Sequence, residues 1–198
     1  MNLGRKLPSL KSGEERLRSN GTFLPTRLLD FWRWSVSDLL SNATRGVLAE
    51  FLVAVGLGCD TRTPRNEWDK FDLTTPEGVK VEVKSAAYLQ SWNQPSGLSK
   101  ISFSIKEALP WDADSNKQGT TKGRSADVYV FCLLHHTDKD TVDPLDLDQW
   151  TFFVRSIREL DRYTRSRSSI TLKSLQAITP TLKFDQLDEE VRAAHSRP

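Results

Sequence analysis

The chain has 198 residues, of which 37% are apolar and 27% charged, with ten glycines and nine prolines. This length suits one domain with a well-buried core, and the composition excludes a collagen-like, low-complexity or membrane-embedded protein. Twenty-eight basic against 26 acidic residues exclude a histone-like polycation but allow a local basic face. Two cysteines, Cys59 and Cys132, are too few for a disulfide framework, so we expect a cytoplasmic protein with no membrane partner.

The N-terminal part of the chain changes character near residue 22. Residues 1–22 are polar and carry five Lys or Arg against two Glu, which predicts a loosely ordered basic arm before a single domain over 23–198. From 28 to 58 the pattern is helical, with apolar residues at the spacing of one helix face. Glu50 falls at the border of this apolar arc, so its carboxylate is expected to turn partly into the protein.

The segment WDKFDLTTPEGVKVEVKS alternates between apolar and polar residues in two runs around a turn. Gly78 fits the left-handed position of a three-residue hairpin loop with a bulge. The resulting register pairs Leu73 with Val81. It also sets Phe71 across from Val83, and both pairs are apolar, as expected for the face of a hairpin that enters the core.

The same register places Asp72 opposite Glu82, on the face that carries Lys84, whereas a four-residue loop would turn Asp72 to the apolar face. Two carboxylates one strand apart repel each other, and a hard cation such as Mg²⁺ or Mn²⁺ relieves this repulsion. Lys84 can then face a metal-bound water or a substrate phosphate. Two acids and a lysine describe a site that could hydrolyse a phosphodiester; the alternative is a surface hairpin with one Glu–Lys pair.

Further strands are predicted at 101–105, 127–134 and 150–154. Residues 106–125 are predicted to form a long polar loop. Ser156 and Glu159 form a capping box that opens a short helix through Tyr163, and FDQLDEEVRAAH reads as a final helix. Helices before and after a set of strands predict an α/β or α+β fold with three layers.

The order of these features resembles the PD-(D/E)XK nuclease superfamily, which has the restriction-endonuclease-like fold. Asp72 matches the first acid of its motif, and Glu82 and Lys84 match the (D/E)-x-K half. Glu50 matches an acid of the preceding helix in many members, while Phe71 stands where the motif often has proline. The resemblance covers about residues 45–134. The strings WRWSVSDLLSNATRGVLAEFLVA and VEVKSAAYLQSW are also similar to those of a group of uncharacterised prokaryotic proteins.

The resemblance implies a three-layer α/β core with a mixed central sheet flanked by helices. It also implies an Mg²⁺-dependent endonuclease that hydrolyses nucleic acid, DNA above all, in restriction, defence or repair, with Mn²⁺ able to substitute. The metal ligands implied are Asp72, Glu82, the Val83 carbonyl and Glu50. Lys84 would orient or deprotonate the attacking water, and in-line attack would leave a 5′-phosphate. The alternative is a catalytically silent module that binds DNA or docks a partner.

Basic residues outside this motif are candidates for contact with nucleic acid. Arg158, Arg162 and Arg165 recur at helical spacing and could follow a phosphate backbone, or they could form a solvated face. Lys122 and Arg124 form a second basic patch in the long loop, which could close over a substrate or be an ordinary loop.

Two further side chains follow the predicted catalytic strand. Trp92 could stack on a base, although tryptophan is more often a core or interface residue, and Gln90 could reach the site from a following helix. Many relatives in the resembling superfamily act as dimers. A twofold pair would suit the cutting of a duplex, but no residue pattern here decides the oligomeric state.

Overall fold

The structure, a computed structural model, describes residues 1–198 except 2, 68, 113–115 and 198. Its centre is a sheet in the order β3-β4-β8-β9, formed by Leu73–Thr74, Lys80–Ala87, Val128–Leu134 and Trp150–Ser156. Strand β4 pairs parallel with β8, whereas β3 pairs antiparallel with β4 and β9 antiparallel with β8. The central sheet is therefore mixed, as the resemblance implied.

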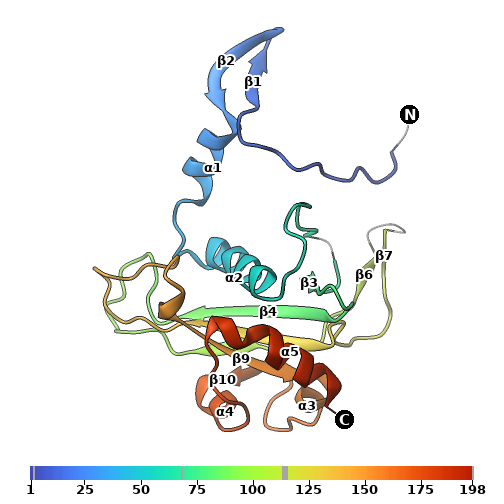
Figure 1. The fold of residues 1–198 in the computed structure, drawn as a ribbon, viewed down its shortest axis with the longest axis vertical. Coiled ribbons are helices and arrows are strands. Elements are labelled where there is room, and N and C mark those ends of the chain that lie inside the picture. The colour runs from blue at the N-terminus through green and yellow to red at the C-terminus, as the bar shows by residue number, and fades with distance from the viewer. Residues whose placement is uncertain (2, 68, 113–115, 198) are drawn as a thin grey trace.

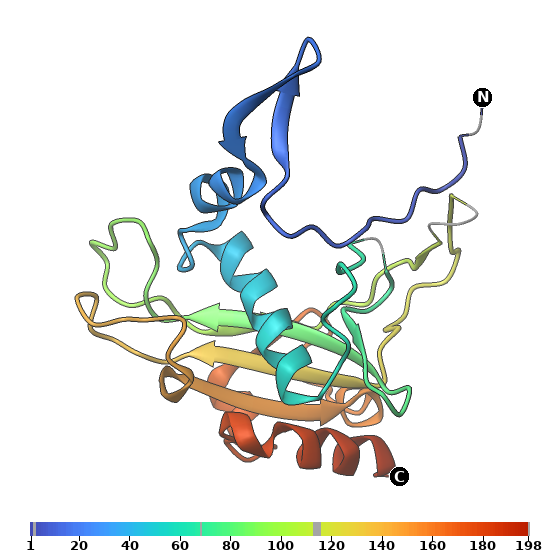
Figure 2. The ribbon, with the colours of Figure 1, turned by 45° about the horizontal axis from the view of Figure 1, so that its top comes forward.

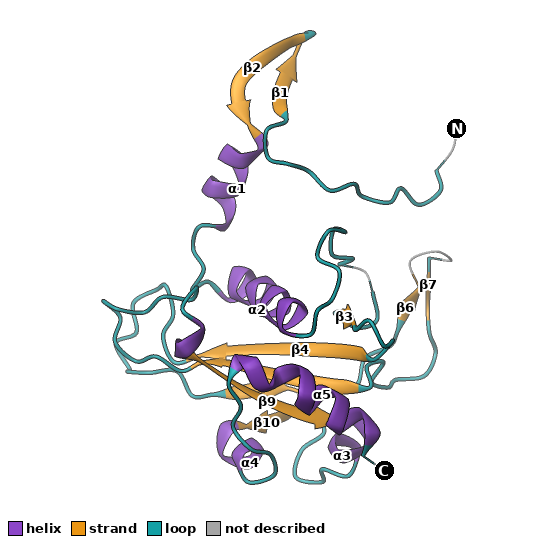
Figure 3. Ribbon diagram, viewed as in Figure 1, coloured by secondary structure: helices purple, strands orange, loops and turns teal. Residues whose placement is uncertain are grey.

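Helices cover both faces of this sheet (Figures 1 and 3). One apolar cluster joins the sheet to α2 (Asn42–Gly56) and α5 (Leu187–Ser196). A second cluster, on the opposite face, includes residues of α3 (Ile157–Asp161) and α4 (Leu172–Gln176). Successive strand residues point to opposite faces, so every residue of β8 is buried in one cluster or the other. The expected three-layer α/β core is confirmed.

The strands predicted at 127–134 and 150–154 are confirmed as β8 and β9. The strand predicted at 101–105 also forms, as β5 (Ser102–Ser104), but it pairs with β10 (Ser169–Thr171) outside the central sheet. Within the loop predicted over 106–125, Trp111–Asp112 (β6) pairs with Lys117–Gln118 (β7). Short 3-10 helices, η1 (Leu147–Gln149) and η2 (Phe184–Gln186), complete the chain.

The N-terminal region contains a hairpin that was not predicted from the sequence. Strands β1 (Arg16–Ser19) and β2 (Thr22–Arg27) pair antiparallel, and α1 (Leu28–Val36) follows directly. Figure 2 shows this hairpin standing away from the central sheet, and α1 buries none of its residues. The helical pattern over 28–58 is thus divided in two, because Ser41 caps a new helix by accepting a hydrogen bond from the Thr44 N–H.

Two local predictions from the sequence are confirmed. Ser156 and Glu159 form the capping box: the Ser156 hydroxyl accepts from the Glu159 N–H, and the Glu159 carboxylate accepts from the Ser156 N–H. In the β3–β4 hairpin, Leu73 pairs with Val81 and Gly78 adopts φ +87°. Among the described residues, no helix has the length and apolar character of a membrane span.

Gly78 and Gly46 allow a matched test of this hairpin. Apart from the adjoining backbone, no heavy atom lies within 4 Å of a Cβ added at either position, so an alanine there acts only through the backbone. Gly78→Ala should destabilise the fold by about 1 kcal/mol because φ is positive. Gly46→Ala, inside α2, should stabilise the fold by up to about 1 kcal/mol. Urea unfolding checks both; a stabilising Gly78→Ala would contradict the turn.

Candidate active site

Asp72 immediately precedes the first residue of β3, at the point where the pairing of β3 with β4 begins. Its Oδ2 accepts a hydrogen bond from the Val83 N–H at 2.7 Å, and its own N–H donates to the Val81 carbonyl at 3.0 Å. A side chain thus replaces the backbone partner that a longer β3 would supply. Since the N–H and C=O of a strand residue point to the same edge, the Val83 carbonyl also faces the side of Asp72.

This arrangement corrects one part of the predicted register. Phe71 packs against the second apolar cluster, whereas Val83 belongs to the first, on the opposite face of the sheet. The prediction that these two residues face each other is therefore wrong. The physical reason is that the Asp72 carboxylate satisfies the Val83 N–H, so the chain before Asp72 leaves the ladder.

Glu82 and Lys84 project from β4 on the face opposite to α2, because they alternate with the buried Val81 and Val83. Lys84 Nζ lies 2.5 Å from Glu82 Oε1, and the two side chains are 29% and 20% exposed. Burial raises the pKa of Glu82, and the negative charge of Asp72 raises it further, against the opposing effect of Lys84. The hairpin places a half-buried acid beside a second carboxylate.

Glu50 approaches Asp72 from α2. Its Oε2 lies 2.8 Å from Nε and 2.7 Å from Nη2 of Arg65, and its side chain is 17% exposed, as expected for a carboxylate turned partly inward. Burial raises the pKa of Glu50, the charge of Asp72 adds to this, and Arg65 and Lys84 oppose it. Asp72 therefore interacts electrostatically with both other acids, from a position between them.

A cavity of about 530 Å³ opens beside this group, lined by Glu50, Arg65 and Asp72 together with apolar side chains of α2. Arg65 was not predicted from the sequence. It belongs to the irregular segment before β3, where no periodicity indicates which residue faces the site. Only the fold shows that this loop brings a guanidinium to the Glu50 carboxylate.

The donor chemistry of the site suits a hard divalent cation, since carboxylate and carbonyl oxygens are its preferred ligands. In the structure, however, the side chains do not bring these donor oxygens together at one point. Within the described ranges, no group of three or more His, Cys, Asp or Glu could hold a metal ion. The carboxylates of Glu50 and Glu82 are instead turned to Arg65 and Lys84. Ligation would require these two acids to exchange their cationic partners for a metal.

Two residues predicted to contact nucleic acid have internal roles instead. The Arg124 side chain is 1% exposed; its Nε and Nη2 donate to the Ile105 carbonyl at 3.0 and 2.8 Å, and its Nη1 contacts Asp161. Gln90 is buried, accepts a hydrogen bond from Arg45 Nη1, and donates to the Ala87 carbonyl. Both side chains support the fold, because polar groups buried this deeply need fixed partners.

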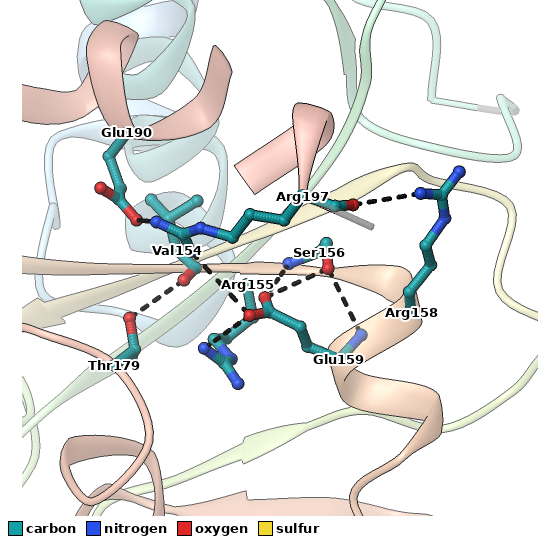
Figure 4. A network of polar contacts seen from close by, with 8 residues as sticks. All are labelled: Val154, Arg155, Ser156, Arg158, Glu159, Thr179, Glu190 and Arg197. Carbon is teal, nitrogen blue, oxygen red and sulfur yellow. Dashed lines mark hydrogen bonds and ion pairs between the residues drawn. The ribbon is translucent and has the colours of Figure 1, made fainter. Parts of the chain in front are cut away.

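The predicted arginine stripe is not a single helix face. Helix α3 ends at Asp161, so Arg162 is only its C-cap, and the exposed Arg165 lies in the following loop. Arg158, also exposed, donates to the Arg197 carbonyl at 3.1 Å (Figure 4). The neighbouring Arg155 pairs with Glu159 at 2.9 Å. The Arg158 contact connects α3 to the C-terminal segment, and the Arg155–Glu159 pair connects β9 to α3.

Trp92 and Lys122 remain accessible. The Trp92 side chain belongs to the exposed large hydrophobic residues, at 52% exposure, and Lys122 is exposed in the segment after β7. Neither lines the cavity that contains Glu50 and Asp72. Their roles in nucleic-acid contact stay predictions.

Residues 27–174 match the sequence family described as bacteriophage T4 endonuclease IV. The chain belongs to this family. The match runs from the last residue of β2 into α4 and includes Glu50, Asp72, Glu82 and Lys84. The expectation of a nuclease is thereby supported at the level of the family. No match is found among curated proteins.

The raised pKa of Glu82 predicts a pH-dependent effect on stability. A folded-state pKa above the unfolded value favours folding of the protonated acid, so this contribution is present below the unfolded pKa and is lost as pH rises through the folded pKa. Glu82→Gln resembles the neutral acid. We therefore expect the variant to raise Tm at pH 7 in chelator, with the difference shrinking toward about pH 4. Thermal unfolding across this range measures it; a lower Tm at pH 7 would contradict the burial argument.

Arg124 generates a second prediction. Arg124→Met removes the charged donor from a buried carbonyl and should lower the free energy of unfolding by about 2–3 kcal/mol. Lys122→Met, two residues away at an exposed position, should change it by less than about 0.5 kcal/mol. Denaturant unfolding of both variants makes the comparison, and equal effects would refute the structural role of Arg124.

Proposed function

We propose that this chain is a metal-dependent nuclease that hydrolyses phosphodiester bonds of DNA, and that its site is that of a PD-(D/E)XK enzyme. The observation that carries the proposal is the edge of β4, where Asp72 meets Glu82 and Lys84 from one strand and Glu50 from a helix. Membership in an endonuclease family supports the reaction class. The strand–turn–strand order and the preceding helix, which carries Glu50, support the superfamily.

Mg²⁺ is the cofactor that this donor set fits best, with Mn²⁺ as a substitute. Asp72, Glu82 and the Val83 carbonyl would hold it, with Glu50 as a further ligand, directly or through water. When bound, the ion would stabilise negative charge on the phosphoryl oxygens and acidify water at the site. Burial raises the pKa values of Glu50 and Glu82, and the negative charge of Asp72 raises them further, which supports a site that gains from a cation.

Lys84 has a role that follows from its present partner. It now pairs with Glu82, and with that carboxylate bound to a cation the ammonium group would be available at the same face of β4. There it would orient or deprotonate the attacking water and stabilise charge on the phosphoryl group. In-line attack by this water would leave a 5′-phosphate and a 3′-hydroxyl.

A catalytically silent DNA-binding module is the second candidate. The clustering of acids argues against it, because carboxylates near phosphate weaken binding unless a cation separates them. Incubation with plasmid, linear and single-stranded DNA and with RNA, in Mg²⁺, Mn²⁺ or chelator, decides between the two. Binding without turnover in any metal would favour the silent module. Restriction, defence and repair are the proposed settings for an active enzyme.

The catalytic proposal predicts the loss of cleavage in two variants with an intact fold. Asp72→Asn keeps an acceptor for the Val83 N–H but removes the charge, and Lys84→Ala removes the ammonium group. Each should lower the Mg²⁺-dependent cleavage rate by at least about 100-fold. Lys80→Ala is the matched control, since Lys80 is an exposed residue of the same strand.

Cleavage of labelled DNA measures the rates, and circular dichroism reports the fold. Wild-type cleavage rates in both folded variants would remove the assignment. A comparable loss in Lys80→Ala would show that the effect is a general one of charge on β4.

A further inference from the structure

A second cavity, of about 830 Å³, lies next to the candidate active site and shares Arg65 and Asn66 with it. Its other polar and aromatic lining residues come from three segments far apart in the sequence: Arg5, Lys6, Glu67, Trp111 and Asn116. It is thus built by the N-terminal segment, the loop before β3 and the β6–β7 pair. The function proposed above leaves this cavity without a role.

The N-terminal segment connects the two cavities. Residues 3–6 and Pro8 line the second cavity, and Leu10 lines the first, together with Glu50 and Asp72. Figure 2 shows this segment running past the loop before β3 toward the β6–β7 pair. The two cavities are therefore neighbours along one stretch of chain, with Arg65 in the wall between them.

The lining of the second cavity has the chemistry of a nucleic-acid subsite. Three basic side chains, Arg5, Lys6 and Arg65, stand against one acid, Glu67. Trp111 is 36% exposed, so part of its ring is accessible to a planar group. Basic side chains that follow a backbone, with an aromatic ring on which a base stacks, form the common arrangement of strand-binding grooves.

We propose that this second cavity binds the part of the substrate that flanks the scissile phosphate. Arg5 and Lys6 contact backbone phosphates, and Trp111 stacks on a base. The inference rests on the proposed function, since it takes the Asp72 site as the place of cleavage. Arg65 lies at the junction, where its guanidinium pairs with Glu50 while the side chain as a whole remains 41% exposed.

DNA binding at the subsite requires no metal, so it can be measured in chelator, separately from metal-dependent cleavage. The double variant Arg5→Ser/Lys6→Ser should bind a fluorescein-labelled DNA oligonucleotide about tenfold more weakly in chelator. The salt dependence of binding, log Kobs against log[salt], should flatten by about 1 to 2 because two phosphate contacts are lost. The control Arg18→Ser/Arg33→Ser removes two exposed charges from the same N-terminal region, outside both cavities.

Trp111 is tested by Trp111→Leu, with Trp111→Phe to restore a stacking ring. Trp34→Leu is the control, at an exposed tryptophan that lines neither cavity. We expect about tenfold weaker binding for Trp111→Leu, recovery in Trp111→Phe, and no change in Trp34→Leu. Circular dichroism confirms that each variant is folded. Binding and a salt slope equal to wild type in both the double variant and Trp111→Leu would overturn the subsite.

Cleavage kinetics distinguish failure of the subsite from failure of the proposed function. If both proposals hold, the subsite variants raise KM and leave kcat near wild type, whereas Asp72→Asn lowers kcat. Wild-type cleavage with unchanged KM in the subsite variants refutes the subsite alone. Absence of cleavage by the wild-type protein refutes the nuclease, while the chelator binding data still decide the subsite. A fall in kcat with unchanged KM would also overturn the subsite, because it would indicate that these residues act in the chemical step and not in substrate binding.

Discussion

The hydrogen bond from the Val83 N–H to the Asp72 carboxylate is the contact on which the candidate site depends. An unpaired N–H on a partly buried strand edge is costly, and a longer β3 would normally satisfy it. Here a side chain does so. As a result β3 begins only at Leu73, and among the described residues β3 pairs with β4 no further than Val81. Asp72 is held at this edge, where it meets Glu82 from one face and Glu50 from the other.

The clustered charges of the site lower the stability of the fold, and packing elsewhere in the structure compensates for this cost. Three carboxylates lie near one another, and the two with raised pKa values are destabilised as anions by burial and by Asp72. Apolar clusters on both faces of the sheet, with the wholly buried β8 between them, supply the compensating stability. Charged groups in unfavourable electrostatic surroundings are typical of functional sites, because a position that suits a reaction rarely gives the highest stability.

Local signals in the sequence were sufficient for the hairpin and its acids. Gly78 set the turn, the turn set the pairing of Leu73 with Val81, and this register brought Asp72 to Glu82. What the sequence could not show depends on contacts between distant segments. Arg65 reaches Glu50 across 15 residues, and Arg124 reaches Ile105 across 19, with no periodic pattern in either loop. Charge alone suggested nucleic-acid contact for Arg124, although its carbonyl partner in the fold makes it a structural residue.

Glu50 and Glu82 would both change partners when the proposed metal binds. Each acid is paired with a cationic side chain, Arg65 or Lys84, and each would have to leave that partner to bind a metal. A metal would thus neutralise the acids and at the same time release a guanidinium and an ammonium group beside the reacting phosphate. The acids would pair with the metal and the two released cations with the phosphate, which would avoid the penalty of leaving a buried charge unpaired. In the proposed enzyme, binding of the metal would therefore favour binding of the phosphate, because it would free two cationic side chains to pair with the phosphate. By linkage, the phosphate would favour binding of the metal to the same extent.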